Sequence, residues 1–147
     1  MMEHKSRNHL YVDVENNSGL KPCDLGKLLH GIIFHRKLAV ISENTTPSLE
    51  TIWSNENHQY EIKSAGSDKN AADNRLINEI MKQHRIDSEQ GFLPSKIYII
   101  TKDSDFTDLT YILVQLGYEV HVLGYGAISL KLEKVATSCT NLREALV

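Results

Sequence analysis

Short apolar runs alternate along this chain with longer segments in which apolar residues recur at helical spacing. The runs are rich in β-branched and aromatic residues and predict strands over 9–14, 38–42, 96–101 and 118–123, with a shorter strand over 60–63. Helical spacing predicts helices over 25–35, 70–84, 105–116 and 128–135. Strands that alternate with helices pair in parallel through right-handed crossovers. The pattern therefore predicts an α/β protein, a three-layer α/β/α sandwich with a mainly parallel central sheet.

Residues with strong local preferences mark some ends of these elements. Asp24 is expected to cap the helix over 25–35, and Gly117 is expected to end the helix over 105–116 in the C′ position. The segment 43–49 is turn-like, and Trp53, which follows it, needs a packing partner that the pattern does not identify.

The size of the chain indicates one domain. It has 147 residues, of which 41% are hydrophobic and 24% charged, close to the values of ordinary globular proteins. Residues 1–8 are polar and predict a flexible tail, so the single domain is expected over 9–147.

Charge and composition limit the class of function. A net charge of −3 excludes a protein that holds nucleic acid through overall positive charge, but it allows a local basic groove. No apolar run is long enough to span a membrane, and the polar start lacks the apolar core of a signal peptide. The short apolar runs therefore predict no membrane association. Cys23 and Cys139 form no CxxC pair, so we expect a reducing, cytoplasmic setting.

Three aspartates come at the C-terminal ends of predicted strands. Asp13 lies near the end of the first strand, and Asp103 and Asp105 follow the strand over 96–101. In an open parallel sheet, ligands bind beyond the carboxyl ends of the strands. Each acid also has a structural alternative: Asp13 could accept hydrogen bonds from loop amides, and Asp103 and Asp105 could cap the helix that follows.

A fourth aspartate, Asp73, belongs to the same group. At helical spacing it shares a face with Ile77 and Ile80, so it is directed toward the core, unless it serves only the first turn of its helix. Several carboxylates in one cleft repel one another, and the same segments hold too few Arg and Lys residues to neutralise them. Oxygen ligands of this kind suit Mg²⁺ or Mn²⁺, and such a centre favours phosphodiester hydrolysis.

Three ordered motifs carry these acids. They are YVDVENNSG at 11–19, NAADNRL at 70–76 and TKDSDFTDL at 101–109. They resemble the Asp-x-Glu-Asn opening motif, the acid-bearing helix motif and the Gly-Asp-Ser-Asp-Phe motif of the NYN group of PIN-like nucleases. The segment GYEVHVLG at 117–124 is similar to the next strand of that family. Lys102 stands where the family motif has glycine.

The resemblance implies a PIN-like α/β/α fold and an Mg²⁺- or Mn²⁺-dependent endoribonuclease that hydrolyses RNA. The catalytic and metal-binding acids, carried over by matching position, would be Asp13, Asp73, Asp103 and Asp105. Asn16 matches the family asparagine and would orient a ligand carboxylate or a phosphate. Ser104 would bond the scissile phosphate or else cap a helix, and Lys102 would either contact phosphate or crowd the site.

Basic residues near the motifs are candidates for binding the RNA backbone. They are Lys63, Lys69, Arg75 and Lys102, with Lys69 and Lys102 as the expected substrate-binding pair. The alternative for each is ordinary solvated surface charge. The segment 43–62 matches none of the motifs and is a candidate for a substrate-selecting insertion. By analogy, a nuclease of this size suggests a homodimer or a regulatory, antitoxin-like protein partner.

Two other functions fit part of the sequence. The first is a catalytically inactive PIN-like module that binds RNA or a protein partner, and Lys102 is its main support. The second is a metal-dependent phosphatase or phospho-receiver, which needs a DxDxT pattern or an isolated acceptor aspartate that the chain lacks. The absence of HExxH, GxxxxGKS/T and GxGxxG motifs disfavours zinc-protease, nucleoside triphosphate and dinucleotide sites.

Overall fold

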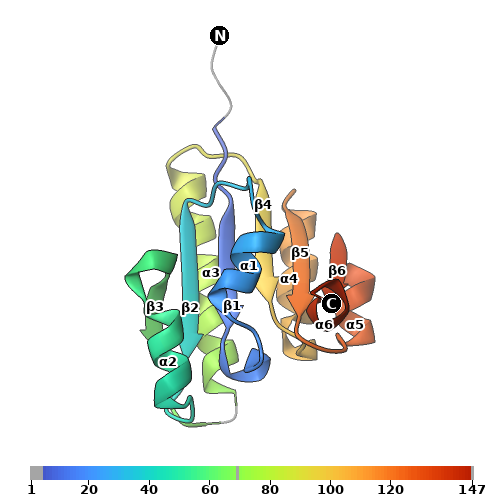
Figure 1. Ribbon diagram of the computed structural model, residues 1–147. Helices are drawn as coiled ribbons and strands as arrows, with labels where there is room; N and C mark the ends of the chain where they lie inside the picture. The colour runs from blue at the N-terminus through green and yellow to red at the C-terminus, as the bar shows by residue number, and fades with distance from the viewer. Residues whose placement is uncertain (1–4, 69, 147) are drawn as a thin grey trace.

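Six parallel strands form one central sheet in the computed structural model, which describes residues 5–68 and 70–146 (Figure 1). The order of the strands across the sheet is β3-β2-β1-β4-β5-β6. The strands are β1 (His9–Asp13), β2 (Arg36–Ile41), β3 (Glu61–Ser64), β4 (Lys96–Ile100), β5 (Glu119–Gly124) and β6 (Ser138–Asn141). The predicted α/β fold with a mainly parallel sheet is confirmed.

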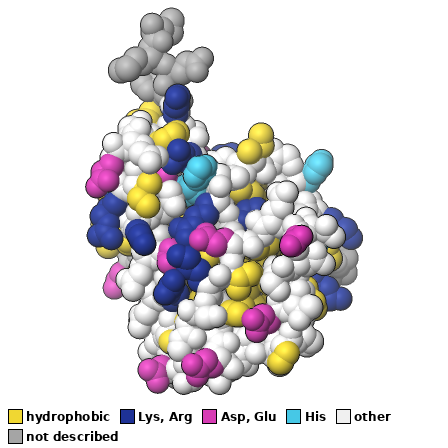
Figure 2. Space-filling model, turned by 90° about the vertical axis from the view of Figure 1, so that its left-hand side faces the viewer, with side chains coloured by type: hydrophobic (Ala, Val, Ile, Leu, Met, Phe, Trp, Pro, Cys, Tyr) yellow, Lys and Arg dark blue, Asp and Glu magenta, His cyan; other side chains and the backbone are white. Residues whose placement is uncertain are grey.

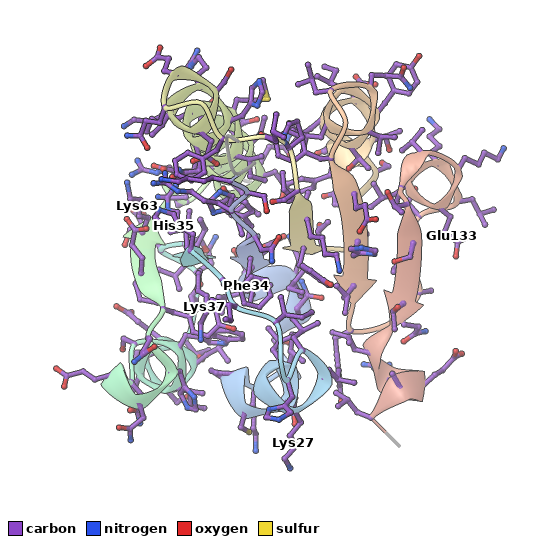
Figure 3. All side chains as sticks on the ribbon, turned by 90° about the horizontal axis from the view of Figure 1, so that it is seen from above. Lys27, Phe34, His35, Lys37, Lys63 and Glu133 are labelled. Atoms are coloured by element: carbon purple, nitrogen blue, oxygen red, sulfur yellow. The ribbon has the colours of Figure 1, made fainter. Side chains whose placement is uncertain are left out.

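Helices cover both faces of this sheet and complete three layers (Figure 3). On one face lie α3 (Ala71–Glu89), α4 (Thr107–Gln115) and α5 (Leu130–Val135). On the other lie α1 (Pro22–Leu28), α2 (Pro47–Trp53) and α6 (Leu142–Ala145). Three 3-10 turns, η1 (Glu15–Asn17), η2 (Glu56–His58) and η3 (Ser104–Phe106), join these elements.

The central strand β1 is buried on both faces. Tyr11 packs into the core beneath α3 and α4, whereas Leu10 and Val12 pack into the core beneath α1. Alternate residues of a strand point to opposite faces, so one continuous apolar run supplies both cores. A carboxylate at the end of such a strand is therefore withdrawn from water unless the chain opens there.

The chain changes direction across the sheet between β1 and β4. From β1 it proceeds outward through β2 and β3, and it then returns to place β4 on the other side of β1. Val12 pairs with Ile100, so these two strands end side by side. Ligand sites in open α/β sheets form at such a reversal, beyond the carboxyl ends of the strands.

The first helix differs from the prediction at both ends. It spans Pro22–Leu28 rather than 25–35, because proline fits the first helical turn and Gly31, with φ of +88°, follows the end of the helix. Asp24 is not the N-cap residue. It lies inside the first turn, where its carboxylate accepts a hydrogen bond from the Lys21 amide at 3.1 Å.

Three short elements, α2, β6 and α6, were absent from the sequence prediction. Helix α2 begins after Thr46, whose hydroxyl accepts a hydrogen bond from the Leu49 amide at 3.3 Å, in the region expected to be turn-like. Its last residue, Trp53, is fully buried and packs edge-on against Tyr60, with ring centroids 5.0 Å apart. The polar strand β6 and the following helix α6 lack the apolar alternation that would have indicated them.

The remaining helices follow the prediction more closely. Gly117 has φ of +102° and ends α4, as expected. Helix α3 extends beyond the predicted end to Glu89, where the buried carboxylate of Asp87 accepts hydrogen bonds from His9 at 2.6 Å and from Gln83 at 2.9 Å. No helix in the described part of the chain is both long and apolar enough to span a membrane.

Half of the predicted N-terminal tail makes contacts with the domain. Arg7 pairs with Asp87 at 3.2 Å, and Ser6 forms a bridge with Leu93. Residues 1–4 of the predicted tail lie outside the described residues.

Candidate metal centre

Three carboxylates meet at the C-terminal edge of the sheet. Asp73, Asp103 and Asp105 each bring one oxygen atom to a group whose members lie within 4.8 Å of one another. Asp103 follows β4, Asp105 lies in η3, and Asp73 lies in the first turn of α3. Helix α3 begins and β4 ends at the carboxyl end of the sheet, so acids that are about thirty residues apart in sequence meet there.

Asp13 lies beside this group at the end of β1. It is 1% exposed, and its charge contributes to the raised pKa of Asp73. Oδ2 of Asp13 accepts a hydrogen bond from the side-chain amide of Asn16 at 2.6 Å. Oδ1 of Asp13 is buried and has no hydrogen-bond partner among the described residues. The structure therefore places Asp13 next to the three clustered acids rather than within them.

Two of the acids, Asp73 and Asp13, have pKa values raised above those of ordinary carboxyl groups. Burial, followed by the charge of Asp13 and the proximity of Asp103 and Asp105, raises the pKa of Asp73 to about 8. Burial also raises the pKa of Asp13, although hydrogen bonds from Asn16 partly oppose this. A centre of this kind has excess negative charge that a cation would offset.

The donor atoms fit a hard divalent cation. Every candidate ligand is a carboxylate oxygen, the donor type that Mg²⁺ and Mn²⁺ prefer. In the described part of the chain, Oδ1 of Asp73 and Oδ1 of Asp13 are buried without any hydrogen-bond partner. A buried, unpaired carboxylate oxygen is costly in a folded protein, and coordination to a cation would remove this cost.

Asp103 also serves as a helix cap. Its Oδ1 accepts a hydrogen bond from the Asp105 amide at 2.9 Å at the start of η3, so the capping alternative holds for this residue, which also contributes one oxygen to the acidic group. Ser104 does not supply the cap. Its exposed side chain borders a hollow beside the acids.

A buried asparagine that the sequence did not single out ties the strand ends together. Asn17, which is 1% exposed, donates from its side-chain amide to the carbonyl oxygens of Asp13 at 2.8 Å and Ile100 at 3.3 Å. Its Oδ1 accepts a hydrogen bond from the Tyr125 amide at 2.9 Å. Asn16 and Asn17 are adjacent in η1, yet Asn16 bonds to the Asp13 side chain and Asn17 bonds to backbone groups.

Lys102 does not lie across the acids. Its aliphatic chain passes over the end of β5, where a Cβ atom added to Gly124 would be 2.5 Å from its Cγ. Its amine lies 3.6 Å from the position of a Cβ on Gly126. Within 5–68 and 70–146, no carboxylate lies within 4.0 Å of this amine. The two glycines thus make room for a lysine where the family motif has glycine.

Lys63 and Arg75 belong to a cluster of basic and acidic side chains on the β3 edge, the side of the molecule that faces the viewer in Figure 2. Glu79 lies 2.9 Å from Lys63, 3.0 Å from Arg36 and 3.3 Å from Arg75. Burial would raise the pKa of Glu79, but hydrogen bonds from Lys63 and Arg36 outweigh it, so this pKa is lowered. Lys69, the other expected phosphate ligand, lies outside the described residues.

An open, polar hollow of about 540 Å³ adjoins the acids. It lies between the start of α3, the start of α4 and α5, and its lining residues include Asn70, Asn74, Ser104, Asp105, Thr107 and Lys131. Side-chain amides, hydroxyls and the amine of Lys131 are therefore present in this hollow. Groups of these kinds bind the phosphate and sugar oxygens of nucleic acids.

The fold and this acidic edge define a PIN-like α/β/α domain with a candidate metal centre. The model of the NYN domain family matches residues 9–143, and the chain therefore belongs to the NYN domain family. This match confirms the resemblance drawn from the motifs, and the family is one of nuclease-type domains.

Comparison with solved structures supports the same fold. The chain is similar to the crystal structure of a protein of unknown function from Vibrio parahaemolyticus, with a TM-score of 0.74. The match covers 96% of this chain and 95% of that chain at 15% sequence identity, a level that shows the fold alone. A search of curated proteins found no match.

Proposed function

We propose that this protein is a metal-dependent endoribonuclease that hydrolyses phosphodiester bonds in RNA. The observation that carries the proposal is the convergence of Asp73, Asp103 and Asp105 at the C-terminal edge of the sheet, with Asp13 beside them. Membership in a nuclease-type family supports the same reaction. Acids with a purely structural role would each be expected to pair with a Lys or Arg side chain. Asp73, Asp103 and Asp105 instead lie close to one another.

The four aspartates would hold Mg²⁺ or Mn²⁺. When bound, such a cation supplies Lewis-acid stabilisation of the charge that develops on the phosphate and makes water a better nucleophile. Asn16 would fix the orientation of the Asp13 carboxylate through the 2.6 Å hydrogen bond to Oδ2, and the unpartnered Oδ1 would be available to the cation. Asn17 holds the ends of β1 and β4 at a constant separation.

The polar hollow beside the acids would receive the RNA backbone. Ser104 borders it and can donate to a phosphate oxygen, and Lys131 supplies a positive charge on the α5 side. Lys102 would contact a phosphate from the β5 side, because its amine has no carboxylate partner in the described segments.

The experiment is cleavage of labelled single-stranded and structured RNA with Mg²⁺, with Mn²⁺ or with chelator. We expect cleavage that requires the cation and that falls by two orders of magnitude or more, roughly, in Asp73→Asn and Asp103→Asn. Glu133→Gln is the matched control, because this acid is exposed on α5 outside the cluster. Equal cleavage by all three variants would contradict the proposal.

A catalytically inactive module is the second candidate, because Lys102 departs from the glycine of the family motif. Such a module would bind RNA with an affinity indifferent to Mg²⁺ and would cleave none of the substrates. Binding and cleavage measured on the same RNA therefore separate the two functions.

We further propose a cytoplasmic setting and a protein partner for the nuclease. Cys23 and Cys139 are both free, in keeping with a reducing compartment. The proposed partner is a second copy of the chain or a regulatory, antitoxin-like protein, and sedimentation of the purified protein alone would identify the homodimer.

A further inference from the structure

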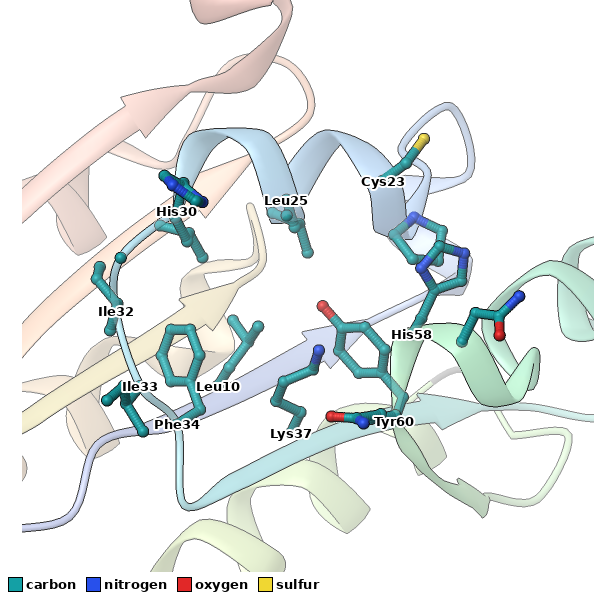
Figure 4. A pocket seen from close by; sticks show the side chains of 16 residues that line it. Leu10, Cys23, Leu25, His30, Ile32, Ile33, Phe34, Lys37, His58 and Tyr60 are labelled. Atoms are coloured by element: carbon teal, nitrogen blue, oxygen red, sulfur yellow. The ribbon is translucent and has the colours of Figure 1, made fainter.

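A second pocket lies on the opposite face of the sheet, over the N-terminal halves of the strands. It encloses about 460 Å³ between α1, the start of β2 and the segment before β3 (Figure 4). Leu10 and Lys37 form its floor, near the beginnings of β1 and β2. The acidic centre follows the opposite ends of the strands, so the two sites share no residue.

Strand register explains why the floor and walls of the pocket combine apolar, aromatic and basic groups. Leu10 pairs with Lys37 on one side and with Tyr98 on the other, so the three side chains share one face of the sheet. Phe34 packs edge-on against Tyr98 at 5.5 Å between ring centroids, and Tyr60 lies beneath the Lys37 amine at 4.4 Å. The pocket thus combines aliphatic side chains with the rings of Phe34 and Tyr60 and the ammonium group of Lys37.

Lys37 has no charged partner in this setting. Among the residues that the structure describes, no carboxylate lies within 4.0 Å of its amine, and burial lowers its pKa. Its neighbour Arg36, directed to the other face, contacts both Glu61 and Glu79. A half-buried cation without a counter-ion favours binding of an anion, because the anion replaces the lost interaction with water.

Other polar groups stand at the rim. Figure 4 shows His30 at one end of the pocket and His58 at the other, with the Tyr60 hydroxyl and the Lys37 amine directed into the space between them. The volume lies in the range of pockets that bind small ligands. Aromatic walls and an unpaired cation select a ligand that is both planar and negatively charged.

We propose that this pocket binds a ligand of mononucleotide size, with its phosphate on Lys37 and its ring against Tyr60 and Phe34. This inference does not rest on the proposed nuclease function, because none of its residues belongs to the acidic centre. A free nucleotide and an unstacked nucleotide of an RNA strand have the same chemistry here, and separate titrations distinguish these two sources.

The chain carries its own reporter of binding. Trp53 is its single tryptophan, and its ring packs edge-on against that of the pocket residue Tyr60, with ring centroids 5.0 Å apart. Adenosine monophosphate and uridine monophosphate are titrated into the full chain with chelator present, and tryptophan fluorescence and binding calorimetry are recorded. Adenosine, inorganic phosphate and a short single-stranded RNA are titrated in parallel.

We expect saturable binding of a mononucleotide that exceeds the binding of adenosine or phosphate alone. Lys37→Gln should weaken it about tenfold or more, as loss of a charge-assisted hydrogen bond implies, and Lys37→Arg should retain it. Lys27→Gln is the matched control, because this exposed lysine of α1 lies outside the pocket lining and should leave binding unchanged (Figure 3). Thermal melts of each variant verify that the fold is intact.

Several results would overturn the proposal. They are the absence of mononucleotide binding at millimolar concentrations, equal binding of adenosine or of phosphate alone, and full binding by folded Lys37→Gln.

A different result would identify the source of the nucleotide. RNA that binds more tightly than the mononucleotide, with the same loss in Lys37→Gln, would assign the pocket to a nucleotide of the strand. Loss of RNA cleavage in the aspartate variants, measured separately, bears only on the acidic centre.

Discussion

Asn16 donates a hydrogen bond to one oxygen of Asp13 at 2.6 Å, and the other oxygen of Asp13 stays buried without a partner. The exposed asparagine therefore controls how a buried carboxylate is turned. A group that orients a metal ligand in this way tunes the affinity for the metal although it does not touch the metal itself.

The first prediction concerns this orienting bond. Asn16→Ala removes the donor to Asp13 and should lower Mn²⁺ affinity and RNA cleavage by about 10- to 100-fold, with little effect on stability because Asn16 is exposed. Calorimetric titration of Mn²⁺ measures the affinity. Asn78→Ala, an exposed asparagine of α3, is the control. Unchanged Mn²⁺ affinity in Asn16→Ala would show that the bond has no such role.

A second prediction follows from Asn17, which makes three hydrogen bonds where Asn16 makes one. Asn17→Ala would leave the carbonyl of Ile100 and the amide of Tyr125 without their buried partner, and this should lower the free energy of unfolding by about 2–4 kcal/mol. Urea unfolding of Asn17→Ala beside Asn16→Ala measures the difference. Two variants of equal stability would contradict the bracing role of Asn17.

A third prediction uses the crowding of the acids. The pKa of Asp73 is raised, so the folded protein binds this proton more tightly than the unfolded chain does. Rising pH therefore favours the unfolded chain, progressively from the ordinary carboxyl pKa up to about 8. Asp73→Asn removes this charge and should raise the melting temperature by several degrees at pH 8 without divalent cation, and by less at pH 5.

Addition of Mg²⁺ should make the melting temperature of the wild type higher than that of Asp73→Asn. The cation binds the folded wild type and raises its melting temperature, whereas Asp73→Asn should gain little. Calorimetric melts at both pH values, with Mg²⁺ or with chelator, test the prediction. A variant that is destabilised at pH 8 in chelator would mean that Asp73 serves the fold rather than the cation.

The layers and the acidic edge of this domain could be predicted because they depend on simple periodicity. β1 and β4 carry buried apolar runs, and a polar residue at or just beyond the carboxyl end of such a run lies at that end of the sheet. Asp13 and Asp103 follow this rule. Asp73 required the additional observation that a helix begins with an acid on its inward face.

Other features depend on contacts that no local pattern contains. Trp53 is buried because Tyr60 meets it from the segment before β3, and its helix α2 lies where the sequence is rich in turn formers. The bracing by Asn17 requires Ile100 and Tyr125, far along the chain. The pocket over Lys37 is formed by four separate segments of the chain, and no sequence motif indicates such a site.

The last prediction concerns Lys102, the one departure from the family motif beside the acids. Its side chain passes over Gly124 and Gly126, and among the described residues no carboxylate lies within 4.0 Å of its amine. Lys102→Gly should therefore leave Mn²⁺ affinity unchanged. It should weaken RNA binding and lower the slope of log K against log salt by about 0.7, the effect of one phosphate contact to a single strand. Binding titrations over a range of salt concentrations, with Lys134→Gly as an exposed control on α5, measure the RNA affinity and its salt dependence.

Tighter Mn²⁺ binding and faster cleavage in Lys102→Gly would instead identify this lysine as the residue that impairs the centre, and would favour the inactive RNA-binding module as the natural state of the protein.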